Sequence, residues 1–401
     1  MELLVARTVA LLGLAMVVAI VARRLRLPYT VGLVLTGLAL ALVRVDVGLK
    51  LTHEVVFDLI LPPLLFEAAL NLRWSELRRD LPPMLLLATF GVVLCGAVVA
   101  AGLVYGLGWP LSPALAFGAL ISATDPIAVI ALLRETGVKG RMALLIESES
   151  LLNDGVAAVL FALATLGGAL PSAGVALGEL AWIAGGGVAL GALAAGLALT
   201  LAGRTQEHMV ETAITAVAAY GSFLAAERMG ASGVLATVTA GLLLGNLGVL
   251  AEPDRPFSLS TQGREFVLAF WEFSAFVANS FVFLLIGLAL AHVGLKFDWR
   301  PVAIVALALI GRAVAVYPVA ALFAFSRWRL PAAEQHFLVW GGLRGALALA
   351  LALTLPVDAP YREQILVGAF AVVAFSVLIQ GLTAGPALRR LGLAPKQGNI
   401  A

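Results

Sequence analysis

The sequence predicts an all-α polytopic membrane protein with about thirteen transmembrane helices. Of its 401 residues, 61% are hydrophobic and only 12% are charged, whereas a soluble domain carries about a quarter charged residues. The apolar stretches recur at lengths near the roughly 20 residues that a bilayer crossing requires. The net charge of +2 is too small to indicate a nucleic-acid partner. The single cysteine, Cys95, has no second cysteine in the chain with which to form a disulfide.

Charged, Pro-rich and Gly-rich stretches divide the chain into the candidate spans. The first, 3–21, is long enough to cross the bilayer, and "ARRLRLP" follows it where a signal peptide would have a small-residue cleavage site. We therefore interpret it as a transmembrane helix. The remaining predicted spans are 28–44, 54–71, 83–107, 113–134, 141–168, 176–202, 208–228, 232–248, 264–293, 300–325, 333–355 and 362–386.

The distribution of basic residues predicts the orientation of these helices. Cytoplasmic connections carry an excess of Lys and Arg. With an odd number of helices and the N-terminus outside, most of the 26 basic residues fall in cytoplasmic connections, and the C-terminus is cytoplasmic. The expected location is the cell (inner) membrane. Arg312 and Arg344 fit no connection, because each lies in the middle of an apolar segment.

Seven ionisable residues are predicted to lie inside the membrane. A charge at mid-membrane costs at least about 2.5 kcal/mol, so such groups are functional candidates that need partners. The acids outnumber the bases, which leaves negative charge for a cation or protons to balance. The seven are Glu67, Asp125, Glu147, Glu149, Asp154, Arg312 and Arg344.

Two of the predicted helices are expected to be broken. In "SATDPIAV", Pro126 removes a helical hydrogen bond and clashes with the preceding turn, which predicts a break at Thr124–Asp125. In "WGGLRGA", three glycines weaken the helix around Arg344. Interrupted helices seven positions apart predict a transporter of inverted repeats, with helices 1–6 matching helices 8–13. Asp125 and Arg344 are suited to neutralising the partial charges of the helix ends that meet there.

The stretch "LLIESESLLNDGVAAVLFALATL" is the candidate ion site. Asp154 and Ser150 are four residues apart on one helical face. The Thr124 carbonyl, freed by the helix break, can supply a further oxygen, and hard cations such as Na⁺ or Li⁺ prefer oxygen ligands. Glu149 is expected to pair with Arg312, since a bidentate carboxylate satisfies the guanidinium.

Each of these assignments has a structural alternative. Asp154 can be an acid satisfied by neighbouring hydroxyl and amide groups, and Glu67 can be paired or simply protonated. The Glu149–Arg312 pair is interpreted as architecture rather than as a transport site. For Asp125 and Arg344 we favour compensation of helix ends, and a direct pairing of the two, over ion binding. The four histidines lie near segment ends, where a solvated side chain is the default.

Five stretches in this order along the chain resemble one family: "LPPLLFEAALNL", "SATDPIAV", "IESESLLNDGVA", "GGLRGALALAL" and "VLIQGLTAGPAL". They are similar to the sodium/proton exchanger branch of the monovalent cation/proton antiporters, of the bacterial NhaP type. The resemblance covers essentially the whole chain. It implies a thirteen-helix inverted-repeat fold and a homodimer. A core part around 83–168 and 300–386 would move past a dimerisation part around 1–71 and 176–293.

The resemblance also implies roles for individual residues. The family's Asn-Asp pair falls on Asn153–Asp154, with Asp154 as the carboxylate that binds cation and proton. Ser150, Thr124 and Glu67 fall on supporting positions, so that Na⁺ would lie at Asp154, Ser150, Thr124 and Glu67. Glu149, Arg312, Asp125 and Arg344 fall on the core's charged network. An asparagine before the aspartate is associated with electroneutral one-for-one exchange.

The function expected from these observations is secondary antiport of Na⁺ or Li⁺ against H⁺, with both ions competing for Asp154. A K⁺/H⁺ antiporter with the same site is the alternative within this class. A channel fits less well, because a paired core and two broken helices favour a gated single-ion site. An intramembrane aspartyl protease would need Asp125 and Asp154 to meet, and a receptor role leaves the excess of acids unexplained. We expect no enzyme activity and no cofactor beyond the transported ions.

Overall fold

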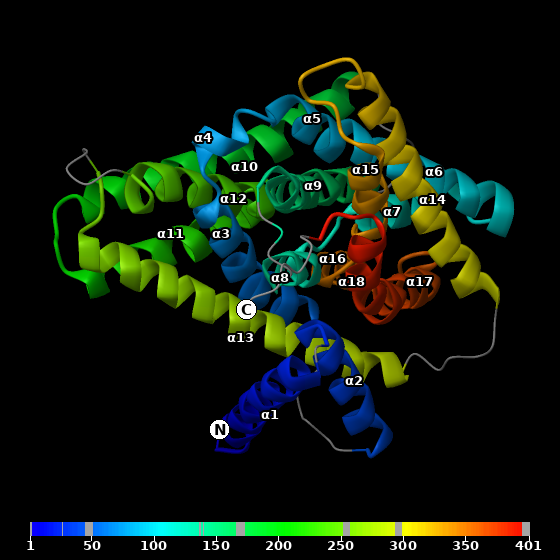
Figure 1. The fold of residues 1–401 in the computed structure, drawn as a ribbon, viewed down its shortest axis with the longest axis horizontal. Coiled ribbons are helices and arrows are strands. Elements are labelled where there is room, and N and C mark those ends of the chain that lie inside the picture. Colours follow the sequence, from blue (N-terminus) through cyan, green and yellow to red (C-terminus); the bar gives the residue numbers. More distant parts are fainter. Residues whose placement is uncertain are drawn as a thin grey trace, which may run out of the picture.

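The computed structural model describes residues 2–25, 27–44, 51–135, 138, 140–165, 173–251, 257–292 and 299–394. Within these ranges every regular element is a helix (Figure 1). Seven stretches are each long and apolar enough to cross a membrane, among them Ala6–Leu25, Leu81–Leu107 and Thr261–Ala291. The predicted all-helical class of membrane protein is confirmed.

In the part of the chain that the structure describes, contiguous and interrupted helices combine into thirteen spans, as predicted. The first six are α1 (Glu2–Leu25); α2 (Tyr29–Leu42); η1 (Val55–Ile60) with α3 (Leu61–Asn71); α5 (Leu81–Leu86), η2 (Leu87–Gly91) and α6 (Val92–Leu107); α7 (Leu111–Ser122) with α8 (Ile127–Glu135); and α9 (Arg141–Thr165). The short α4 (Trp74–Leu77) lies in a connection, and the η segments are π-helical turns inside longer helices.

The seventh span is α10 (Ala173–Ala202). The last six are α11 (His208–Arg228); α12 (Gly233–Leu244) with η3 (Gly245–Val249); α13 (Thr261–His292); α14 (Trp299–Leu322); α15 (Ala332–Trp340) with α16 (Ala346–Thr354); and α17 (Arg362–Phe375), η4 (Ser376–Gln380) and α18 (Gly381–Arg390). These bounds agree with the predicted spans to within a few residues, because hydropathy decides which residues can lie in the bilayer.

The helix packing has the symmetry expected of two repeats in which helices 1–6 match helices 8–13. Span 2 packs along span 10 (α2 on α13), and span 3 packs along span 9 (α3 on α12). Adding or subtracting seven converts one pair into the other. The contacts α1–α2 and α11–α12 are related in the same way. Both long contacts are made by glycine: a Cβ on Gly287 would lie 2.2 Å from the Val34 carbonyl oxygen, and one on Gly245 would lie 2.3 Å from that of Leu70. Small residues let membrane helices approach this closely.

The spans form two groups that pack mainly among themselves. One group contains α5 to α9 and α14 to α18, with major contacts of α6 on α7, α14 on α6, and α7 on α9. The other contains α1 to α3 and α10 to α13, with major contacts of α13 on α2 and α10 on α12. We call them the core group and the flanking group. The assignment of a moving core part and a dimerisation part to these ranges stays a prediction.

The two broken spans meet inside the core group. α7 ends at Ser122 and α8 begins at Ile127, while α15 ends at Trp340 and α16 begins at Ala346. The non-helical segments touch, since the Asp125 backbone N–H donates to the Leu343 carbonyl at 2.7 Å. Both breaks occur where they were predicted, because Pro126 and the glycines from Gly341 to Gly345 weaken a helix wherever they stand.

Candidate functional site: an acidic cavity at the helix crossing

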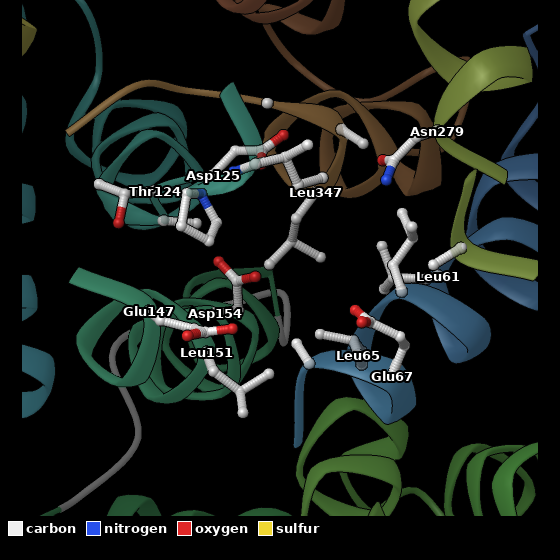
Figure 2. A pocket seen from close by; sticks show the side chains of 18 of the residues that line it. Leu61, Leu65, Glu67, Thr124, Asp125, Glu147, Leu151, Asp154, Asn279 and Leu347 are labelled. Atoms are coloured by element: carbon white, nitrogen blue, oxygen red, sulfur yellow. The ribbon is translucent and has the colours of Figure 1, made fainter. Parts of the chain in front are cut away.

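A cavity of about 230 Å³ lies between the crossing segments and the flanking group. Its walls come from α3, α9, α13 and α16 and from the break between α7 and α8 (Figure 2). Among the residues that line it are Glu67, Asp125, Glu147 and Asp154, and none of its described lining residues is a lysine or arginine. Four carboxylates and none of these basic side chains therefore border the space, which favours cations.

Asp154 reaches this cavity from the middle of α9. Glu147, Leu151 and Asp154 follow one another at helical spacing on the face of α9 that lines the cavity. The Asp154 Oδ1 atom is buried and has no hydrogen-bond partner in the structure. Nearly all buried polar atoms are paired, so an unpaired carboxylate oxygen needs an explanation. A cation or a proton bound there would supply the missing partner.

A second face of α9 is hydrogen-bonded to the break in the other helix. The Ser150 hydroxyl donates to the Thr124 carbonyl. The Thr124 backbone N–H donates to Asn153 Oδ1 at 3.2 Å, and Asn153 Nδ2 donates to Thr124 Oγ1 at 2.7 Å. All three residues are at most 4% exposed. Broken helices leave backbone groups without partners, and these side chains supply partners for two of them.

This network changes how the predicted cation ligands are arranged. Thr124 lines the cavity, whereas Ser150 and Asn153 are not among the lining residues. Ser150 shares the Thr124 side of α9 rather than the cavity face of Asp154. The Thr124 carbonyl oxygen and the Ser150 hydroxyl are bonded to each other. Their role as direct cation ligands therefore stays a prediction, although each oxygen keeps a free lone pair while this hydrogen bond is made.

Glu149 and Arg312 form a bidentate ion pair between α9 and α14. Arg312 Nη1 and Nη2 donate to the two Glu149 carboxylate oxygens at 2.5 and 2.8 Å. Arg312 Nε also donates to the Leu338 carbonyl at 3.2 Å. Glu149 is 1% exposed and Arg312 is 6% exposed. Neither charge is left without a partner, so this pair ties three spans of the core group together without contributing to the cavity.

The expected direct pairing of Asp125 with Arg344 is wrong. No ion pair within 4.0 Å joins these two described residues. Arg344 Nη1 instead donates to the Ser122 and Ala123 carbonyls, each at 2.9 Å, which lie at the C-terminal end of α7. The Asp125 carboxylate accepts the backbone N–H groups of Ile127, at 3.0 Å, and Ala346, which open α8 and α16. Each charge thus compensates helix ends of the opposite sign, the role expected of it.

Glu67 lines the cavity from α3, on the side of the flanking group. Its Oε1 atom accepts a hydrogen bond of 2.9 Å from Asn71 Nδ2 one turn along the helix. Figure 2 shows Glu67 and Asp154 on different walls of the cavity, with Leu65 and Leu151 nearby. Glu67 therefore belongs to the cavity but projects from a different group of helices than Asp154.

One polar residue of the cavity was missed at the sequence level. Asn279 lines it from α13, and its Oδ1 atom is buried without a hydrogen-bond partner. The signal was present in "AFVANSFVFLLIG", where an amide interrupts an apolar run. Counting only ionisable side chains passed over it. In the part of the chain that the structure describes, no three His, Cys, Asp or Glu side chains converge as a resident metal site would require.

An acidic cavity beside two broken helices that cross at mid-span defines a secondary transporter. Comparison with known proteins agrees with this class. Residues 11–390 match the family model described as "Sodium/hydrogen exchanger, transmembrane". The chain therefore belongs to the sodium/hydrogen exchanger family.

Individual relatives cover most of the chain. The Na⁺/H⁺ antiporter ApNhaP of Aphanothece halophytica is 40% identical over 92% of this chain and 70% of its own length. The Na⁺/H⁺ antiporter NhaP of Pseudomonas aeruginosa is 37% identical over 92% of both chains. The solved structure of the sodium proton antiporter MjNhaP1 from Methanocaldococcus jannaschii has the same fold, with a TM-score of 0.77 at 20% identity over 98% of this chain and 99% of that one.

Proposed function

We propose that this protein exchanges Na⁺ or Li⁺ for H⁺ across the cell membrane, with both ions competing for Asp154. The observation that carries the proposal is the buried, unpartnered Asp154 Oδ1 in an acidic cavity at the helix crossing. The names of the relatives support Na⁺ as the cation. None of the relatives compared above is named for K⁺, so the K⁺/H⁺ alternative has no specific support.

The mechanism follows from the chemistry of a single carboxylate. A proton and a cation neutralise Asp154 equally well, but neither binds well while the other is present. Glu67 and the Thr124 carbonyl offer further oxygens around the cavity, and the Ser150 hydroxyl keeps its lone pairs while it donates to Thr124. A hard monovalent cation prefers such oxygen ligands. Binding one ion therefore releases the other, and the Asp154 carboxylate serves both.

Alternating access requires the core group to move past the flanking group. Asp154 travels with the core group, whereas Glu67 and Asn279 stay on the flanking wall. Moving a bare carboxylate through apolar contacts is costly, so movement is favoured only when Asp154 is neutralised by either ion. This restriction makes the exchange obligatory. The self-contained packing of the two groups supports relative movement, and we assign the flanking group to the interface of a homodimer.

Further features of the proposal rest on the resemblance and on charge distribution. Asn153 occupies the position associated with electroneutral one-for-one exchange. In this structure Asn153 bonds Thr124 and donates to Glu149 at 3.3 Å. Because its amide is neutral, it adds no charge beside Asp154. The bias of basic residues supports an external N-terminus and a cytoplasmic C-terminus.

The test is cation-induced dissipation of a pH gradient in proteoliposomes, with the intact protein and Asp154→Asn compared at several Na⁺, Li⁺ and K⁺ concentrations. We expect Na⁺ and Li⁺ to collapse the gradient only with the intact protein. Asp358→Asn, an exposed loop carboxylate, is the matched control and is expected to exchange normally. If Asp154→Asn still exchanges ions, the working carboxylate is elsewhere, and Glu67 and Asp125 are the next to be replaced.

A further inference from the structure

Asn279 is a buried amide whose position no structural role explains. It lies in the middle of α13, 9% exposed, directly after the apolar Ala278 and shortly before Phe281 and Val282. Its Oδ1 atom has no hydrogen-bond partner. Leaving a buried acceptor unsatisfied destabilises the folded state, whereas an apolar side chain of the same size carries no such penalty.

The adjacent residue, Ser280, shows what a satisfied polar group on this helix looks like. Its hydroxyl donates to the Phe276 carbonyl at 2.6 Å and also bonds the Tyr29 hydroxyl of α2. Ser280 is buried and is not a lining residue of the cavity. Asn279, one residue earlier, lines the cavity and lacks such partners for its oxygen. The difference between the neighbours is therefore the cavity itself.

Figure 2 shows the Asn279 amide projecting from α13 between Leu347 and Leu61, on a different wall from Asp154. α13 belongs to the flanking group, so this amide stays in place when the core group carries Asp154 past it. An amide oxygen coordinates a hard cation as water does, but it adds no negative charge. The four carboxylates of the cavity already attract cations; a neutral oxygen lets a cation shed a water without attracting protons as well.

We propose that the Asn279 amide oxygen is a fixed ligand that replaces one hydration water of the monovalent cation in the cavity, and so sets cation affinity and selectivity. This inference rests on the proposed antiport at Asp154. It makes Asn279 the cation-specific counterpart of Asp154, which serves cation and proton alike. Loss of the oxygen should therefore affect the cation half of the exchange and leave the proton half intact.

The experiment measures initial rates of exchange in proteoliposomes against Na⁺, Li⁺ and K⁺ concentration, for the intact protein and Asn279→Leu. Because one contact of this kind is worth about 0.5–1.5 kcal/mol, we expect the KM for Na⁺ to rise about 2- to 10-fold. The maximal rate at saturating Na⁺ is expected to stay near that of the intact protein. The preference for Na⁺ over K⁺ is expected to fall, because the larger ion depends less on replacing its hydration water.

Two further variants make the test specific. Asn279→Asp keeps an oxygen in the same place but adds a carboxylate that also binds protons, so it is expected to bind Na⁺ with a KM that rises more steeply as the pH falls than that of the intact protein. Ser280→Ala removes a polar group from the same turn of α13 but not from the cavity, and is expected to behave like the intact protein. If the leucine variant is not recovered folded, Asn279→Ala removes the oxygen without adding bulk and carries the same prediction.

An unchanged KM and ion preference in the leucine or alanine variant would overturn the inference. So would a lower maximal rate at unchanged KM, or an equal effect of Ser280→Ala, since either would indicate a structural role. Failure of the proposed function looks different, because the intact protein would then show no Na⁺-dependent exchange, or Asp154→Asn would retain it.

Discussion

Two faces of the helix α9 carry acids in the same membrane-spanning segment, but the acid on one face is paired and the acid on the other is not. On the buried face, Glu149 is held by both arms of Arg312 and by Asn153. On the cavity face, Asp154 has a buried oxygen without any partner. The two carboxylates are only five positions apart in the sequence. Composition and spacing do not distinguish a structural acid from a working one; the partners of each do.

The comparison implies that the two faces respond to substitution in opposite ways. Removing one charge of the Glu149–Arg312 pair leaves the other charge buried in apolar surroundings without a partner. Removing it from the cavity face relieves an uncompensated charge. Substitutions on the two faces of α9 should therefore separate effects on stability from effects on transport.

The largest effect is expected from breaking the Glu149–Arg312 pair. Arg312→Met leaves Glu149 buried without its partner, and breaking a buried pair in this way costs about 3–5 kcal/mol. We expect a strong loss of folded protein in the membrane and a lower melting temperature in detergent. The double variant Arg312→Met with Glu149→Met replaces both charges by apolar groups and is expected to recover much of the loss.

The double variant is the control for this prediction. If it is as unstable as Arg312→Met alone, the loss comes from the Arg312 contacts with Leu338 and not from an orphaned carboxylate. If Arg312→Met is as stable as the intact protein, the pair is not what holds α9 against α14, and the distinction between the two faces fails.

A smaller effect is expected from Ser150→Ala. The substitution leaves the Thr124 carbonyl, at the helix break, without the hydroxyl that now donates to it. An unsatisfied buried carbonyl costs about 1–3 kcal/mol, so the melting temperature should fall measurably but less than for Arg312→Met. Ser148→Ala is the matched control, because the Ser148 hydroxyl donates only within α9, to the carbonyls of Leu144 and Leu145. Equal losses for the two serines would contradict a specific role at the break.

The spans, the two helix breaks and the buried acids were all predictable from the sequence. Each depends on local chemistry: hydropathy for the spans, Pro126 and the glycines around Arg344 for the breaks. The predicted direct pair of Asp125 with Arg344 was wrong, because such a pair depends on how the two broken segments are turned toward each other. The sequence also could not show which side chains of α9 line the cavity. Ser150 is four residues from Asp154, yet it bonds Thr124 and is not among the residues that line the cavity.

The smallest effect on stability is expected from the variant with the largest effect on transport. Asp154→Asn removes a charge whose Oδ1 atom has no partner, so its melting temperature without Na⁺ should equal or exceed that of the intact protein. Ligand binding stabilises a folded protein by about 1.4 kcal/mol at ten times the dissociation constant. Na⁺ should therefore raise the melting temperature of the intact protein, with K⁺ at equal ionic strength as control, and should leave that of Asp154→Asn unchanged. If Asp154→Asn melts at a lower temperature without Na⁺ and is still stabilised by Na⁺, Asp154 has a structural role and the cation binds elsewhere in the cavity.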